Sequence, residues 1–514
     1  MHPEIVNPHT LNIANEFRGS NRSDSAEATV DATRSHAQPA SSGVTRNRLL
    51  RGGVWVLVLR VTGICLAVIV NAVLARVLTK EAFGNFIWFS SLLTVGGCAS
   101  RLGMERLIPR FVAESVVRRD LLAYYGTFRK GSLLAMLCTL SLAAVWSIYL
   151  MAGGLGYLSL PRSGATVILT SLTIVTGSIL MIAAESLRGL HRPFQASLFS
   201  ADASGPLIAC LLLLQVAMAS TYGQIDFLGS LFMLLVSMAI PAFIATLLLM
   251  RAIRESAPIA ATVAALDSGP IQNSPTMTGD QPTYRRLFSA GWPIMLTQLF
   301  AMICIFSDIW IAKICCNDEQ LALMGASRRL VLMISMPMTI MNLAITGAIP
   351  TLYAERNLAR LQAVLQRSAL IGFIPSMIAV ITLTVAPAFV LSVLYGAAYS
   401  NAGPLVSTMA IGIGILCWSG AAELLLVLTG QQRCSMTISV IAGIASPVVC
   451  YLVSNFDNAW TIALASSIVL AVRSLAMWWF AYQTIGVWTN PSLGFFRRTQ
   501  ENDFPPSPCE SFRS

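Results

Sequence analysis

Long apolar runs alternate with short polar gaps from about Gly53 to Gly486. A helix that spans a bilayer needs about 20 mostly apolar residues. The runs of that length number twelve and cover residues 54–75, 83–102, 131–152, 165–184, 200–219, 227–250, 290–314, 327–350, 369–393, 405–428, 435–454 and 459–485. The run at 200–219, which contains Asp202 and Pro206, fits the pattern least well. The pattern predicts an all-α integral membrane protein with about twelve transmembrane helices.

The second half of the chain repeats landmarks of the first half in the same order. The matched pairs are Trp55 and Trp292, Ala75 and Ala312, and Arg76 and Lys313 at a displacement of 237, then Pro109–Glu114 and Pro350–Glu355, Gly189 and Gly430, and Arg192 and Arg433 at a displacement of 241. Such an internal repeat is typical of transporters, in which two related halves rock around a site held between them. Because each half contains an even number of runs, the two six-helix lobes should have the same orientation in the membrane.

Polar composition marks three segments outside the helices. Residues 1–48 are rich in Ser, Ala, Asn and Thr and are expected to form a disordered N-terminal tail. Residues 251–285 contain several prolines and are interpreted as a linker, and residues 487–514 as a C-terminal tail. The two lobes are therefore expected at residues 49–250 and 286–486.

The charges are few and unevenly placed. The chain is 55% hydrophobic and 11% charged, with a formal net charge of +10, whereas an ordinary soluble domain is roughly 25% charged. Most arginines lie in alternate gaps, such as Arg118 and Arg119, and the gaps between them are poor in basic residues. This is the positive-inside pattern. It predicts that both termini are cytoplasmic, and it explains the basic excess without a nucleic-acid partner.

Arginines within the apolar runs are candidates for function, because a charge in the bilayer is costly and seldom incidental. Arg60 lies early in the first run and either extends to the cytoplasmic interface or faces the interior. Arg473 lies near the middle of the last run, where it would attract an anionic substrate or neutralise a buried carboxylate. Arg328 and Arg329 open the eighth run near the outer face, either as an interfacial anchor or as pore residues.

Two acidic residues are the candidate coupling-ion or charge-relay groups. Asp308 lies deep in the seventh run and corresponds to Asn71 by the displacement of 237. It would pair with Lys313 or with a pore arginine, or bind a coupling proton or cation. Glu423 lies in the tenth run and is the second candidate.

Motifs for other chemistry are missing from the sequence. It contains no GxxxxGK[ST] phosphate loop, no cysteine and histidine cluster with zinc-ligand spacing, and only four histidines, three of them in the N-terminal tail. We therefore expect no metal site, no cofactor and no enzymatic activity.

Four short segments carry a resemblance to a known family. In residues 71–84, Ala75-Arg76 is followed by an acidic residue, an aromatic residue and Gly84. The other segments are Leu102-Gly103-Met104 running on to Ala113, Leu187 to Arg192, and Leu394-Tyr395-Gly396 to Ala402. These segments resemble, in order and spacing, the bacterial polysaccharide flippases of the multidrug/oligosaccharidyl-lipid/polysaccharide exporter superfamily.

The resemblance implies two six-helix lobes around a central cavity. It also implies alternating-access transport of a polyprenyl-pyrophosphate-linked oligosaccharide across the bacterial inner membrane, for O-antigen, capsule or exopolysaccharide biosynthesis. The expected partners are this lipid-linked substrate, the lipid bilayer, a polysaccharide polymerase and a chain-length regulator. Cationic cavity residues would meet the pyrophosphate or acidic sugars, for which the planar fork of arginine is suited. Arg60 and Arg473 best fit this role, followed by Arg328 and Arg329.

Two other interpretations stay open. A cation- or proton-coupled multidrug antiporter of the same superfamily would use buried carboxylates, and Asp308 and Glu423 are available. A membrane-bound polysaccharide polymerase or ligase would be expected to have a long outer loop with catalytic residues, and the longest outer gap, at about 153–164, is short.

Overall fold

The computed structural model describes residues 42–104, 107, 121–154, 163–190, 192–200, 205–219, 225–266, 283–454 and 458–492. The chain divides into two compact units, Met1–Val54 and Trp55–Ser514. Apart from the start of α2, all described helices belong to the second unit. Most of the predicted N-terminal tail, the linker after Leu266 and the centre of the outer gap at 153–164 lie outside the described residues.

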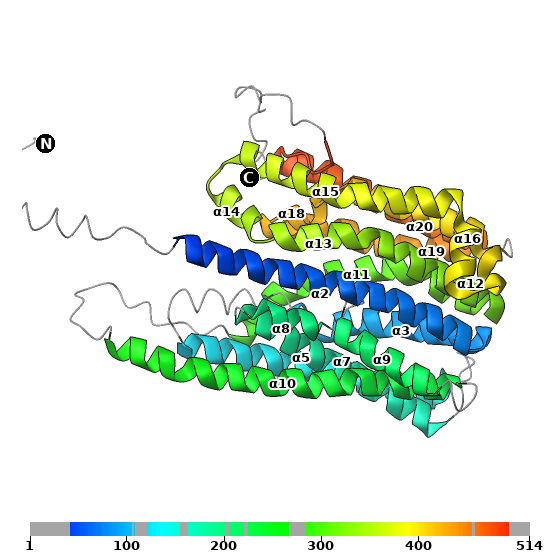
Figure 1. Ribbon diagram of the computed structural model, residues 1–514, viewed down its shortest axis with the longest axis horizontal. Helices are drawn as coiled ribbons and strands as arrows, with labels where there is room; N and C mark the ends of the chain where they lie inside the picture. Colours follow the sequence, from blue (N-terminus) through cyan, green and yellow to red (C-terminus); the bar gives the residue numbers. More distant parts are fainter. Residues whose placement is uncertain are drawn as a thin grey trace, which may run out of the picture. The chain divides into compact units, whose positions relative to one another are not determined.

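The described residues form helices and turns, with no strand among them (Figure 1). The helices of the first half are α2 (Ser42–Val77), α3 (Lys80–Ser100), α5 (Leu121–Tyr149) with the π-helix η1 (Leu150–Gly154), α7 (Gly164–Gly189), α8 (Pro193–Leu198), α9 (Pro206–Ala219) and α10 (Phe227–Leu266). Those of the second half are α11 (Tyr284–Cys315), α12 (Asp318–Leu332), the 3₁₀-helix η2 (Met333–Ser335), α13 (Met336–Ile345), α14 (Ala348–Ala354), α15 (Leu358–Val385), α16 (Pro387–Tyr395), the 3₁₀-helix η3 (Ala397–Ala402), α17 (Gly403–Trp418), α18 (Ala422–Leu428), α19 (Gln432–Ser454) and α20 (Ala459–Ile485).

The predicted all-α membrane architecture with about twelve helices is confirmed. Within the described ranges, eleven helices are long and apolar enough to cross a membrane. The weakest predicted run, at 200–219, corresponds to the 14-residue helix α9, which begins at Pro206. Proline is tolerated there because the first turn of a helix does not use the missing N–H group.

Polar side chains set where several helices begin. Thr79 Oγ1 accepts a hydrogen bond from the Ala82 amide at 3.2 Å, and Asn317 Oδ1 accepts one from the Gln320 amide at 2.8 Å. Such N-caps satisfy amides that have no partner within the helix. Because Asn317 caps α12, this helix starts at Asp318, whereas hydrophobicity alone places the start of the eighth span at residue 327. The first turn of α12 is polar, so hydrophobicity alone leaves it outside the span.

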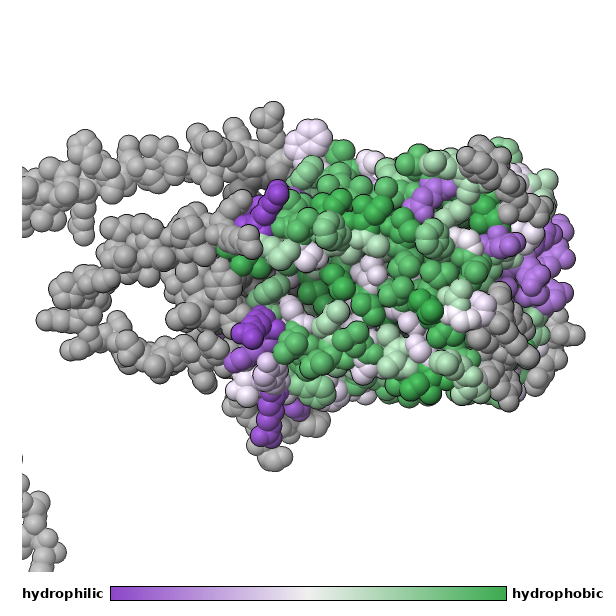
Figure 2. Space-filling view, turned by 90° about the horizontal axis from the view of Figure 1, so that it is seen from below, coloured by the Kyte–Doolittle hydropathy of each residue, from purple (hydrophilic) through white to green (hydrophobic). Residues whose placement is uncertain are grey.

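The surface is apolar along the sides of the helices and polar at their ends. Figure 2 shows hydrophobic residues over the middle of the visible face and hydrophilic residues toward both ends. Large side chains such as Val145, Phe243, Val385 and Ile441 are more than half exposed. Soluble monomers rarely expose an apolar surface of this extent, and it fits contact with a bilayer.

The second helices of the two halves, α3 and α12, pack against each other. The contact lies near the end at which both begin, here called the Lys80 end; the opposite end of α3 is called the Gly103 end. Gly325 is required there, because a Cβ atom on it would lie 3.0 Å from Ile87 Cδ1. Gly84 lies similarly close to Leu321. Absence of side chains on these glycines allows α3 and α12 to approach closely.

Polar contacts join the two halves at the same end. Lys80 forms an ion pair with Glu319. Lys313 Nζ donates a hydrogen bond to Asn85 Oδ1 at 2.7 Å, and Trp310 Nε1 donates one to Ser91 Oγ at 2.9 Å. A further bond, 2.5 Å long, runs from Arg76 Nη2 to the Val393 carbonyl oxygen. The structure therefore represents a state in which the halves are joined at the Lys80 end.

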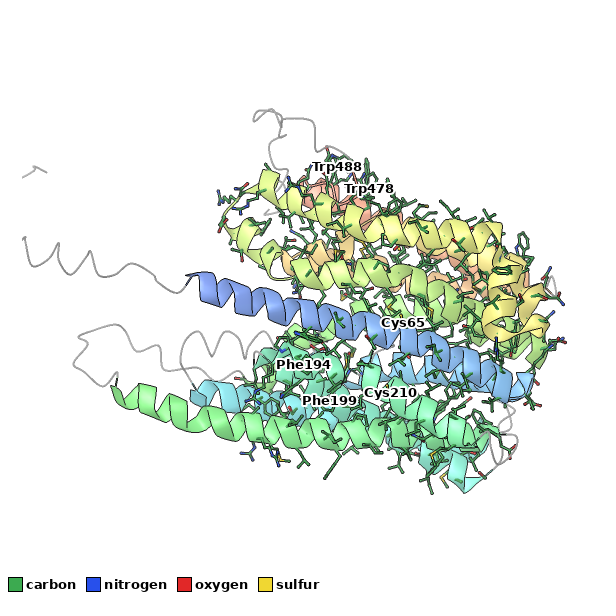
Figure 3. The ribbon with its side chains drawn as sticks, viewed as in Figure 1. Cys65, Phe194, Phe199, Cys210, Trp478 and Trp488 are labelled. Atoms are coloured by element: carbon green, nitrogen blue, oxygen red, sulfur yellow. The ribbon has the colours of Figure 1, made fainter. Side chains whose placement is uncertain are left out.

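The residues that follow α20 pack back onto the helices. Trp488 stacks on Tyr482 with ring centroids 3.8 Å apart and lies 4.9 Å from the Trp478 ring (Figure 3). Thr489 Oγ1 donates a hydrogen bond to the Ser419 carbonyl oxygen at 2.7 Å. These residues, 487–492, are called the C-terminal segment. The boundary predicted at residue 487 therefore cuts through packed structure, and any tail starts later.

We expect Gly325→Leu to weaken the joined state, because its side chain would push α3 away from α12. Distances between spin labels at positions 81 and 401 in a cysteine-free background should become longer and broader. Gly347→Leu is the matched control, since a Cβ atom at Gly347 would meet nothing within 4 Å. An unchanged distance distribution in Gly325→Leu would contradict a closure that depends on this contact.

The C-terminal segment should contribute to stability. A chain ending at residue 486 is expected to unfold at a lower temperature than one ending at residue 492. The stacked aromatic pairs alone contribute about 0.5–1.5 kcal/mol each beyond their buried area. Thermal unfolding of the detergent-solubilised protein measures this, and equal midpoints for the two truncations would refute it.

Candidate functional site

A buried ion pair between Arg328 and Asp308 lies inside the second half. Arg328 Nε donates to Asp308 Oδ2 at 2.9 Å, and Nη2 of the same guanidinium contacts the same oxygen. Nη2 also donates to Ser466 Oγ at 3.0 Å. The side chains of Arg328 and Asp308 are 2% and 0% exposed. The pair therefore links α11, α12 and α20 without access to solvent.

The depth of this pair follows from the helix starts. Arg328 is ten residues into α12, about 15 Å along the axis at 1.5 Å per residue. This is about half of the hydrocarbon thickness of a bilayer. The interpretation of Arg328 as an interfacial anchor is therefore wrong, because the span begins earlier than hydrophobicity indicates. Of the partners considered for Asp308, the structure places one of the candidate arginines, Arg328, against it.

Arg329 points toward the first half of the chain. Its Nη2 atom contacts Ser90 Oγ on α3. Its Nε atom is buried without a hydrogen-bond partner among the described residues. Among the described residues, Arg329 is thus paired with a hydroxyl group rather than with a carboxylate. No salt bridge among these residues neutralises the positive charge of Arg329.

A second ion pair joins Arg473 and Glu423. Arg473 Nη2 donates to Glu423 Oε2 at 2.8 Å and to Ser439 Oγ at 3.2 Å. The side chain of Arg473 is 3% exposed, whereas that of Glu423 is 34% exposed. Arg473 is fourteen residues into α20, about 21 Å from its start. It therefore neutralises a carboxylate, as one of its two interpretations proposed, and Glu423 forms the accessible side of the pair.

Arg60 lies on α2, in the first half of the chain. It is 8% exposed. Seventeen residues separate it from the end of α2 at Val77, about 25 Å along the axis, which places it toward the Gly103 end. The burial of Arg60 favours its interpretation as an interior residue over one that extends freely into solvent.

Comparisons with known proteins identify the fold. No protein-family model matches the chain, and no curated protein matches it. Among solved structures, an inward-facing multidrug resistance MATE family transporter of the MOP superfamily matches with a TM-score of 0.58 at 14% sequence identity, over 84% of this chain and 98% of the other. The lipid II flippase MurJ matches with a TM-score of 0.58 at 11% identity, over 85% and 90%.

A third match is a MOP superfamily transporter from Pyrococcus furiosus, described as having a binding pocket of reverse polarity. Its TM-score is 0.57 at 16% identity, over 85% of this chain and 95% of the other. The chain has the MOP superfamily fold. At these identities the likeness concerns the fold alone. The substrates of the three proteins do not carry over with it.

Sequence reasoning missed the hydroxyl partners of the arginines, Ser90, Ser439 and Ser466. One signal was available for Ser466, because it precedes Arg473 by two helical turns and so shares its helix face. The repeat offered another. At the displacement of 237, Asn71 corresponds to Asp308 and Ser91 corresponds to Arg328. The first half therefore has neutral residues at the positions where the second half has its buried ion pair.

We expect Asp308→Asn to destabilise the protein by about 3–5 kcal/mol, because it leaves the Arg328 guanidinium buried without a counter-charge. Asp226→Asn is the matched control, since Asp226 is exposed at the start of α10. Thermal unfolding in detergent measures both variants. The double variant Asp308→Leu/Arg328→Met should regain most of the lost stability, and loss equal to that of Asp308→Asn would contradict the paired arrangement.

Proposed function

We propose that this protein is an alternating-access flippase that moves a polyprenyl-pyrophosphate-linked oligosaccharide across the bacterial inner membrane for polysaccharide biosynthesis. The transporter part of the proposal is supported by the MOP superfamily fold, shared with a multidrug transporter and with a lipid-linked flippase. The choice of substrate depends on the charges inside the helices.

The charge balance at the candidate site is the observation that carries this choice. The six candidate residues comprise four arginines and two carboxylates, and each carboxylate is already paired with an arginine. Arg329 contacts the hydroxyl group of Ser90, so among the described residues its positive charge is not paired with a carboxylate, in a region that is largely shielded from water. Such a region attracts anions strongly, because a low dielectric weakens screening. The pyrophosphate and any acidic sugars of the proposed substrate supply those anions.

The closed Lys80 end is consistent with the proposed direction of transport. The charge pattern predicts that this end faces outward and that both termini are cytoplasmic. With the halves joined by Lys80, Glu319, Lys313 and Asn85, a substrate would enter from the Gly103 end, on the cytoplasmic side. The polysaccharide polymerase and the chain-length regulator remain the partners proposed for the product on the outer side.

A cation- or proton-coupled multidrug antiporter is the second candidate. The observation in its favour is that Asp308 and Glu423 both lie in the second half, within reach of arginines that would respond to their charge. In that case the carboxylates would bind the coupling ion. Resistance to cationic drugs in a pump-deficient strain, lost in Glu423→Gln, would favour the antiporter over the flippase.

We expect Arg473→Ala to abolish export of the glycan while the protein stays folded, because Glu423 is partly exposed and tolerates loss of its partner. Complementation of a flippase-deficient strain measures export, and size-exclusion chromatography of the purified variant measures folding. Arg360→Ala is the control, since Arg360 is exposed in the first turn of α15. Full complementation by Arg473→Ala would exclude a role of this arginine in substrate binding.

A further inference from the structure

The two buried arginines of the second half use their guanidinium groups differently. In Arg328, Nε and Nη2 form one edge of the planar group, and both meet Asp308. In Arg473, only Nη2 meets Glu423, and Nε is buried with no hydrogen-bond partner among the described residues. An arginine edge binds a carboxylate or phosphate best when both of its N–H groups donate. The edge of Arg473 is therefore only half used.

The carboxylate at this half-used edge is the more accessible partner. Glu423 is 34% exposed, whereas Arg473 is 3% exposed. If the Glu423 carboxylate moved away from Arg473 and no other anion took its place, the buried guanidinium would have no counter-charge, which is strongly unfavourable. Replacement by another anion avoids this cost, because Arg473 keeps a counter-charge throughout. An oxyanion with two oxygens at the right spacing would also use the Nε–H group that Glu423 leaves without a partner.

Glu423 lies on a short helix that has a glycine with positive φ beyond each end. Helix α18 has seven residues and lies between Gly420, with φ +70°, and Gly430, with φ +89°. Residues with a side chain rarely adopt such angles. Gly420 packs against the Thr489 carbonyl of the C-terminal segment, whereas a Cβ atom on Gly430 would meet nothing within 4 Å. Helix α18 is therefore flanked by two glycines in backbone conformations that other residues rarely adopt, an arrangement that suits a hinged motion.

We propose that Glu423 is a built-in counter-ion, which occupies the pyrophosphate-binding position on Arg473 when no substrate is bound. Movement of α18 then removes Glu423 from Arg473 as the pyrophosphate group binds there. The inference rests on the proposed function and adds a regulatory step to it. Without substrate, Glu423 neutralises Arg473. When the lipid-linked pyrophosphate arrives, its oxygens take both N–H groups of the Arg473 edge, and α18 carries Glu423 away.

The test measures binding to the full-length protein in lipid nanodiscs. The probes are a sugar-free polyprenyl pyrophosphate, the matching uncharged polyprenol and inorganic pyrophosphate. Glu423→Gln removes the competing charge, so we expect it to bind the polyprenyl pyrophosphate about tenfold more tightly than the wild type. Affinity for the polyprenol should stay unchanged. The double variant Glu423→Gln/Arg473→Ala should show no gain over the wild type.

Glu355→Gln is the matched control, because it removes the same charge from an exposed position after α14. It should bind all three probes as the wild type does. If Glu423→Gln does not fold, Glu423→Asp replaces it. The side chain of this variant is one methylene shorter, so its carboxylate competes less well for Arg473. We therefore expect it to bind the polyprenyl pyrophosphate more tightly than the wild type, by less than about tenfold.

The outcomes separate the two proposals. A wild-type protein that binds no polyprenyl pyrophosphate contradicts the proposed function and the counter-ion together. A wild-type protein that binds it, with Glu423→Gln binding equally or more weakly, overturns the counter-ion alone. A gain for the polyprenyl pyrophosphate only supports recognition of the head group on its lipid. An equal gain for inorganic pyrophosphate supports recognition of the free anion at the same arginine.

Discussion

The ion pair between Arg328 and Asp308 is the constraint around which α11, α12 and α20 pack. A guanidinium and a carboxylate lie about 15 Å along α12 from its start, shielded from solvent, and removing either one alone would be strongly destabilising. Their contact, with Ser466, fixes the mutual positions of α11, α12 and α20. Arg329, the next residue on α12, is thereby directed toward Ser90 on α3, in the first half. One pair thus sets both the core of the second half and part of its contact with the first.

The second pair, Arg473 and Glu423, has the same chemistry in a different setting. Glu423 is on a seven-residue helix between two glycines, and it is partly exposed. The first pair is closed by Ser466 and has no accessible side, whereas the second leaves one guanidinium N–H group without a partner among the described residues. Local packing therefore gives one arginine a structural role and leaves the other available for an exchangeable anion.

The predicted internal repeat shows where the two halves differ in charge. The residues opposite Asp308 and Arg328 in the first half are Asn71 and Ser91, which are neutral. Asn71 bonds to the carbonyl oxygen of Ala67 in its own helix, and Ser91 accepts a hydrogen bond from Trp310. The repeated scaffold is thus shared, and the ion pair distinguishes the second half. Differences between the halves are where substrate or ion specificity is to be sought.

Hydrophobic run length by itself determined the all-α membrane fold and nearly every span, because the bilayer requires a fixed length of apolar helix. Burial cost also singled out Arg328, Asp308, Arg473 and Glu423 as candidates. Only the tertiary structure decided how they pair, since partners 20 and 50 residues apart meet through helix packing that no local pattern encodes. It also decided the start of α12, where one hydrogen bond to Asn317 outweighs the polarity of the first turn. The sequence shows which charges the membrane must accommodate, and the packing of α11, α12, α18 and α20 determines which of them stays accessible.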